Sequence, residues 1–162
     1  VPCEVKPLSV VAGPWGGCWE SSGPGLHVLA EHPDGGIVAH AAIVDRLLYP
    51  GDAVLRTGYV EAVATHPAWQ GRGLGTRVME AIDGLIDDRY QLGALGTGRH
   101  SFYARLGWVS WQGPTWVRRV DGVLYRSADE DGDIMVRTTP ATPLLLDLTL
   151  PIAVDWRPGE VW

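Results

Sequence analysis

Three glycines at alternate positions, Gly71, Gly73 and Gly75, form the segment of this sequence with the clearest chemical potential. They follow an apolar run rich in Val and Tyr and directly precede a stretch with helical periodicity. Glycine lets successive backbone N–H groups turn toward one point, and the N-terminus of a helix adds partial positive charge. The pattern favours a phosphate-binding loop, and a glycine-rich helix entry that binds no ligand would share it.

Two common phosphate-binding motifs are excluded at these glycines. A Walker loop ends in Gly-Lys-Ser/Thr, whereas Gly75 is followed by Thr76 and Arg77. A dinucleotide-binding fingerprint needs G-x-G-x-x-G, and position 76 is Thr. Any phosphate held here would therefore belong to another class of ligand.

Acidic residues gather in the run 129–133, Asp-Glu-Asp-Gly-Asp. Most such runs are solvated turns. An EF-hand is excluded because the glycine stands at 132 and no glutamate occupies the twelfth position. The histidines, at positions 27, 32, 40, 66 and 100, show no metal-ligand spacing, so we expect no metal.

Hydrophobic patterning predicts the elements that would position these residues. Apolar runs bounded by turn residues predict strands over residues 26–30, 37–48, 54–65, 90–95, 108–111 and 134–137. The first three should form an antiparallel meander, with a hairpin turn at 32–36. A helix should follow Gly75, with its apolar side at Leu74, Val78, Ile82 and Leu85 and with Asp83 on its polar side. This order predicts an α+β fold around one mixed sheet.

Length and charge limit the class of protein. A chain of 162 residues has the size of one domain, and a net charge of −6 argues against nucleic acid as a partner. No apolar run approaches the roughly 18 residues that read as a membrane span. Residues 1–8 contain no apolar signal core, and Cys3 and Cys18 are expected to be free thiols in a reducing cytoplasm.

The first 25 residues are broken by Pro and Gly and contain no initiating Met. We expect residues 1–25 to be an irregular or truncated N-terminal segment, followed by one domain over residues 26–162.

Two motifs identify a resemblance. Residues 70–75, Gln-Gly-Arg-Gly-Leu-Gly, match the Q/R-x-x-G-x-G/A acetyl-CoA signature of the GNAT N-acetyltransferases, and residues 102–108 are similar to their Y-x-x-x-G-F/W element. More specifically, residues 58–64, 90–95 and 155–162 resemble segments of aminoglycoside 2′-N-acetyltransferases. The resemblance runs from about Trp19 to the C-terminus. It implies a mixed, mostly antiparallel sheet with flanking helices and splayed central strands.

The resemblance also implies a site for acetyl-CoA. The pyrophosphate would lie on the glycine-loop amides, and the pantetheine would follow the edge of the preceding strand, where a backbone N–H near Val63 could stabilise an oxyanion. The implied coenzyme-binding residues are Val63, Ala64, Thr65, Gln70, Gly71, Arg72, Gly73, Leu74 and Gly75.

Acetyl transfer to an amine needs a proton acceptor and benefits from a proton donor. Glu61 is the candidate base, because a lone carboxylate in an otherwise apolar strand is costly to bury without a partner or solvent. The alternative is an outward-facing strand residue. Tyr103 is the candidate acid for the departing thiolate, and the alternative is a tyrosine packed under Trp108.

The acceptor in this family is a polycationic aminosugar, and the acidic residues would bind its ammonium groups. The residues implied in acceptor binding are Glu61, Ala62, Gly96, Asp129, Glu130, Glu160 and the carboxylate of Trp162. A homodimer is implied by the family analogy alone.

Two other functions remain open. The chain could be a GNAT enzyme that acetylates another small amine, or a coenzyme-A-binding module with an impaired acceptor site. The second alternative arises because residues 1–18 depart from the family's pattern of two helices and have Cys18 in the place of an aspartate.

Overall fold

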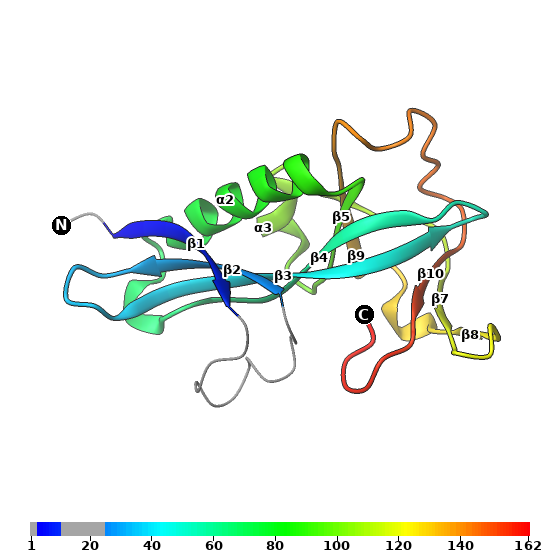
Figure 1. The fold of residues 1–162 in the computed structure, drawn as a ribbon, viewed down its shortest axis with the longest axis horizontal. Coiled ribbons are helices and arrows are strands. Elements are labelled where there is room, and N and C mark those ends of the chain that lie inside the picture. The colour runs from blue at the N-terminus through cyan, green and yellow to red at the C-terminus, as the bar shows by residue number, and fades with distance from the viewer. Residues whose placement is uncertain (1–2, 11–24) are drawn as a thin grey trace. The chain divides into compact units, whose positions relative to one another are not determined.

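The computed structural model describes residues 3–10 and 25–162 (Figure 1). The chain divides into two compact units. Unit 1 comprises the described residues up to Val44 together with Val60–Asp88, and unit 2 comprises Asp45–Tyr59 and Arg89–Trp162. Strands β3 (Ile37–Pro50) and β4 (Leu55–Thr65) contribute residues to both units.

Unit 1 contains the predicted hairpin. Strand β2 (Gly25–Glu31) pairs antiparallel with β3, with Leu26 opposite Ile43 and Ala30 opposite Ala39. The turn is closed by a 2.8 Å hydrogen bond from the His32 N–H to the Gly36 carbonyl. Gly35 has a φ of 90°, which glycine adopts without steric cost. The expected Asp-Gly hairpin is therefore confirmed.

A further strand, β1 (Glu4–Val10), lies within the segment that was expected to be irregular. It pairs antiparallel with β2 over its whole length, with Pro7 opposite Val28. Proline is tolerated there because β1 has no second neighbour among the described strands, so the missing N–H need not join a ladder. Residues 1–2 and 11–24 of that segment, including Cys18, lie outside the described residues.

Helix α2 (Leu74–Arg89) confirms the amphipathic helix after the glycines. Its buried apolar residues are Leu74, Val78, Met79, Ile82 and Ile86. The stripe continues at four-residue intervals through Ile86, so Leu85, which the sequence placed in it, is only half-buried. The prediction that Asp83 faces the polar side is wrong: its side chain is buried, since it lies beside Ile82 and one turn after Met79.

Unit 2 contains a mixed sheet with the strand order β6-β9-β5-β4-β3-β10-β7-β8. The strands not yet defined are β5 (Leu92–Gly96), β6 (Val109–Ser110), β7 (Thr115–Arg118), β8 (Leu124–Arg126), β9 (Ile134–Thr138) and β10 (Ile152–Asp155). Two pairings, β4–β5 and β7–β10, are parallel, whereas β3–β10, β5–β9, β6–β9 and β7–β8 are antiparallel. This confirms the expected α+β fold with a mixed, mostly antiparallel sheet.

The parallel pairing of β4 with β5 covers Thr57–Tyr59 and Leu92–Ala94. Each strand continues past this pairing, β4 to Thr65 and β5 to Gly96, while the splay of the central strands stays a prediction.

Short helices complete the described elements. The 3₁₀ helix η1 (Pro67–Trp69) follows β4, and η2 (Ala128–Glu130) lies in the acidic run. Helix α3 (His100–Ala104) follows β5, and Gly107, with a φ of 89°, lies just beyond its end. No helix in the part of the chain that the structure describes is long and apolar enough to cross a membrane.

Gly113 permits a close backbone crossing in unit 2. An ideal Cβ at this position would lie 1.9 Å from the Leu150 carbonyl oxygen, which accepts a hydrogen bond from the indole of the buried Trp111 at 2.8 Å. The Leu150 carbonyl is a backbone group and is tied to the core by this hydrogen bond, so it cannot move away from an added Cβ without disturbing the core.

We therefore expect Gly113→Ala to reduce the free energy of unfolding by about 2 kcal/mol or more. Urea denaturation would measure the change. Gly98→Ala is the matched control, because a Cβ at Gly98 would meet nothing within 4 Å. Equal urea midpoints for the two variants would contradict the close crossing.

Candidate functional site

The glycine loop of unit 1 is anchored to the end of β4. The side-chain amide of Gln70 donates a 3.2 Å hydrogen bond to the Thr65 carbonyl, and the ring of His66 accepts one of 3.2 Å from the Ala68 N–H. The Arg72 guanidinium lies 4.6 Å from the centre of the Trp69 ring, a cation–π distance. The loop therefore has defined attachments on both sides of its first glycine.

Gly71 and Gly73 both adopt positive φ, 73° and 76°. A Cβ at either position would meet nothing within 4 Å, so the outer side of the loop is open. The Arg77 N–H donates to the Gly73 carbonyl at 3.1 Å, at the start of α2. The N–H groups of residues 74–76 precede this bond and have no acceptor within the helix. They can donate to an anion at the helix N-terminus.

Strand β4 changes direction at Ala62, whose φ is 53°. Among the residues that the structure describes, it is the one non-glycine with positive φ. Such a conformation costs an L-residue about 1–2 kcal/mol, so its surroundings must hold it. The flanking side chains of Glu61 and Val63 are half-buried.

Tyr103, the candidate acid, lies in α3 and is 8% exposed. Burial raises the pKa of its phenol, and the charge of Arg99 partly opposes this. The ring lies edge-on to Trp108, with 6.4 Å between centroids. Tyr103 therefore packs against Trp108, as the alternative to an acid role required. The raised pKa also keeps its phenol protonated and able to donate.

Unit 2 contains a cavity of about 480 Å³. It is lined by Gly96, Val117, Ser127, Glu130, Glu160, Val161 and Trp162. Four residues predicted for acceptor binding, Gly96, Glu130, Glu160 and Trp162, are therefore brought together. The predicted Asp129 is exposed in η2, whereas Glu61 and Ala62 belong to unit 1.

The cavity has an acidic character. Partial burial raises the pKa of Glu130, and the negative charges of Asp133, Asp129 and Glu160 raise it further. Carboxylates that repel one another gain free energy when a cation binds between them. The arrangement can therefore bind an ammonium group.

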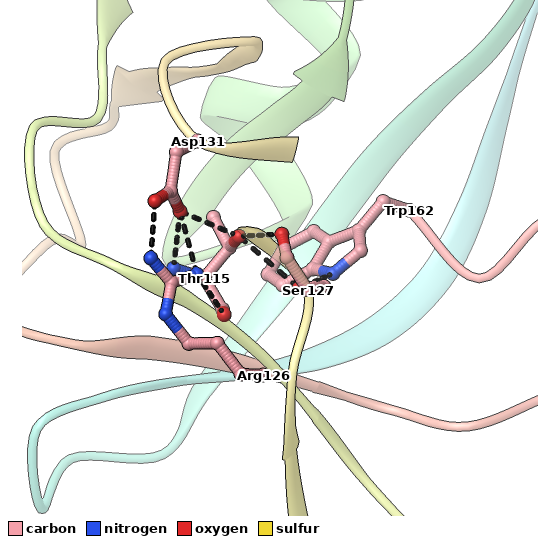
Figure 2. A network of polar contacts seen from close by, with 5 residues as sticks. All are labelled: Thr115, Arg126, Ser127, Asp131 and Trp162. Carbon is pink, nitrogen blue, oxygen red and sulfur yellow. Dashed lines mark hydrogen bonds and ion pairs between the residues drawn. The ribbon is translucent and has the colours of Figure 1, made fainter. Parts of the chain in front are cut away.

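A polar network holds Trp162 at this cavity (Figure 2). Its indole N–H donates to the Ser127 hydroxyl at 3.0 Å, and that hydroxyl donates to Thr115 Oγ1 at 3.1 Å. The Asp131 carboxylate accepts from the Thr115 backbone N–H at 2.9 Å and pairs with both terminal nitrogens of Arg126.

The sequence did not reveal this network, because Thr115, Arg126 and Ser127 belong to no recognised motif. Asp131 was predicted only as one member of an acidic run. In the structure it differs from its neighbours, because Arg126 and the Thr115 donors hold the pKa of its carboxyl well below the usual range.

A lowered pKa stabilises the fold above the carboxyl pKa of the unfolded chain, about 3.9. That stabilisation declines as the pH falls below this value, because the unfolded chain then binds a proton that the folded state does not, and it is gone once the pH is also below the pKa of the folded state. We expect Asp131→Asn to lower the urea midpoint at pH 7, and the gap from the wild type to narrow as the pH falls below about 4. The exposed Asp129→Asn is the control, with a midpoint close to the wild type. A gap that stays constant with pH would contradict the assignment.

Comparisons with known proteins address the function of these groups. Residues 23–110 match the family model of the acetyltransferase (GNAT) domain. The chain is 42% identical over 147 residues to an aminoglycoside 2′-N-acetyltransferase of Mycolicibacterium fortuitum, covering 89% of this chain and 74% of that protein.

One of the solved structures that resemble this chain, with a TM-score above 0.5, shows the same fold. A GNAT family N-acetyltransferase from Escherichia coli, crystallised in complex with CoA, superposes with a TM-score of 0.58 at 16% identity, covering 82% of this chain and 67% of the other. A GCN5-related N-acetyltransferase from Kribbella flavida matches with a TM-score of 0.49 at 24% identity, over 54% of this chain and 23% of the other.

Proposed function

The chain belongs to the GNAT acetyltransferase family, and from that premise we propose that it transfers the acetyl group of acetyl-CoA to the 2′-amine of an aminoglycoside. The observation that carries this choice of acceptor is the acidic cavity of unit 2, where Glu130 and Glu160 lie with Trp162. An aminoglycoside carries several ammonium groups, which such a cavity can bind through charge-assisted hydrogen bonds. The name of the Mycolicibacterium relative supports the same acceptor.

Acetyl-CoA would bind at the glycine loop of unit 1. The open side of Gly71 and Gly73 and the N–H groups at the start of α2 suit the pyrophosphate, with the guanidinium of Arg72 beside them. The pantetheine would follow residues 63–65 of β4. The Escherichia coli structure with CoA supports a coenzyme of this kind.

In the reaction we propose, the acceptor amine attacks the thioester carbonyl carbon, so that a C–N bond forms and the C–S bond breaks. Glu61 takes the proton from the amine, directly or through one water. The Val63 N–H donates to the developing oxyanion. Tyr103, kept protonated by burial, donates its proton to the departing thiolate. Asp129 adds negative charge beside the acceptor cavity.

A single proposed domain over residues 26–162 would carry all of these groups. A cytoplasmic location and a homodimer complete the proposal by analogy with the family. Two alternatives remain, a GNAT enzyme for another small amine and a coenzyme-A-binding module with an impaired acceptor site.

An assay of thiol release from acetyl-CoA tests the proposal. We expect release with tobramycin and none with an analogue that lacks the 2′-amine, because that amine is the nucleophile. Calorimetry with coenzyme A supplies an independent measure of the donor site. Release only with other amines would support the first alternative, and coenzyme binding without any turnover would support the second.

We expect Glu61→Gln to lower kcat by about 100-fold or more, because the amide cannot accept the amine proton. The dissociation constant for acetyl-CoA should change little, since the coenzyme is bound mainly by the glycine loop. Steady-state kinetics and calorimetry would measure the two effects. Glu80→Gln, at an exposed position on α2, is the matched control. Equal turnover in wild type and Glu61→Gln would remove Glu61 from the role of base.

A further inference from the structure

Two buried histidines of unit 1 form a hydrogen-bonded pair that ends on Ala62. His40 Nδ1 lies 2.9 Å from the Ala62 carbonyl oxygen, and His27 Nδ1 lies 2.9 Å from His40 Nε2. The exposed fraction of the side chain is 3% for His27 and 8% for His40. They come from adjacent strands, because His27 of β2 lies opposite Ala42 and His40 of β3 lies opposite Leu29.

The carbonyl at the end of this chain fixes the positions of the protons. A carbonyl oxygen only accepts, so His40 Nδ1 must carry hydrogen. In a neutral His40, Nε2 is then an acceptor, and the hydrogen between the rings must belong to His27 Nδ1. Burial supports the neutral form, because it is the main cause that lowers the pKa of His40 to about 4 and also lowers the pKa of His27. Both donated hydrogens therefore point toward Ala62.

The hydrogen bond from His40 to Ala62 fixes the orientation of a whole peptide group and not of the carbonyl alone. The carbonyl of Ala62 and the N–H of Val63 belong to the same planar peptide, and this peptide is trans. They point in opposite directions, so holding the carbonyl against His40 also fixes the direction of the Val63 N–H. The positive φ of Ala62 equally determines how the strand presents Glu61 on its other side.

We propose that His27 and His40 are positioning residues, which hold the left-handed turn at Ala62 and thereby aim the Val63 N–H and the Glu61 carboxylate for acetyl transfer. This inference rests on the proposed function. Neither histidine need touch the substrate or the coenzyme. His40 acts through the Ala62 peptide, and His27 acts by fixing the tautomer and ring orientation of His40.

Paired substitutions at His40 test the proposal. Leucine cannot donate to Ala62, whereas the asparagine side-chain nitrogen lies near the place of Nδ1 and can. We expect His40→Leu to lower kcat by about tenfold or more while KM for acetyl-CoA changes less than about threefold. His40→Asn should recover most of that loss. His27→Leu should produce a smaller loss, because the bond from His40 to Ala62 remains possible.

Two further variants separate positioning from simple loss of stability. Val28→Ala truncates a fully buried residue on the same strand as His27, so it should lower the melting temperature without lowering kcat. Ala62→Gly removes the steric penalty of positive φ. In the His40→Leu background it should restore part of kcat, because the turn then needs less support.

The outcomes distinguish this inference from the proposed function. A wild-type protein without turnover on aminoglycosides would overturn both. Normal wild-type turnover with an unchanged kcat in a folded His40→Leu would overturn the positioning role alone, as would a kcat loss of equal size in Val28→Ala. Should His40→Leu fail to fold, ¹⁵N NMR of the wild-type imidazoles decides the matter. A His40 protonated at Nδ1 is expected, and one protonated only at Nε2 would overturn the proposal.

Discussion

The proposed chemistry of unit 1 depends on directed backbone N–H groups, and therefore on positive φ at a few positions. Gly71 and Gly73 adopt it without steric cost and leave an open side above the start of α2. Ala62 adopts it at a cost, and the structure supplies a compensating hydrogen bond from a buried imidazole. Within β4, regular strand geometry would favour keeping the N–H groups in the ladder, where no ligand could reach them.

The acidic residues of unit 2 have two different roles. Asp131 is engaged by Arg126 and Thr115, and Asp133 lies 3.4 Å from His100, so these two carboxylates fix the shape of the acidic run. Glu130 and Glu160 line the cavity instead. Asp131 and Asp133 therefore position the cavity wall, while the carboxylate of Glu130 is left to bind a cation. The acidic run 129–133 therefore contains carboxylates that hold the structure and a carboxylate that lines the cavity.

Sequence reasoning succeeded where the signal is local. Alternation and turn residues predicted β2, β3, β4 and β5, and the four-residue apolar spacing predicted α2, because each of these patterns is contained within one element. It failed where the outcome depends on distant partners. Strand β1 contains a proline, and β7 and β8 are short, so each is formed by pairing with neighbours rather than by its own pattern.

The same limit applies to the candidate site. The glycine loop could be located from residue spacing, whereas the cavity residues came from the family resemblance, since Gly96, Glu130 and Trp162 share no local pattern. Neither route revealed His27, His40 or the network around Asp131. The two histidines are thirteen positions apart and reach a carbonyl twenty-two positions beyond His40. Only the register of β2 with β3 brings them together, and register is a property of the whole sheet.

The chemical nature of the pair follows from its surroundings. A lysine or arginine at position 40 could also donate to the Ala62 carbonyl, but it would bring a charge into a nearly fully buried site, which is costly without a partner. A cation at the Ala62 carbonyl would also lie close to the neighbouring residue Glu61. Positive charge there favours the ionised carboxylate and weakens it as a base. A neutral imidazole avoids both penalties. A second imidazole behind it supplies the donor that keeps the first in the required tautomer, so a pair of histidines is suited to hold this turn beside the proposed base, Glu61.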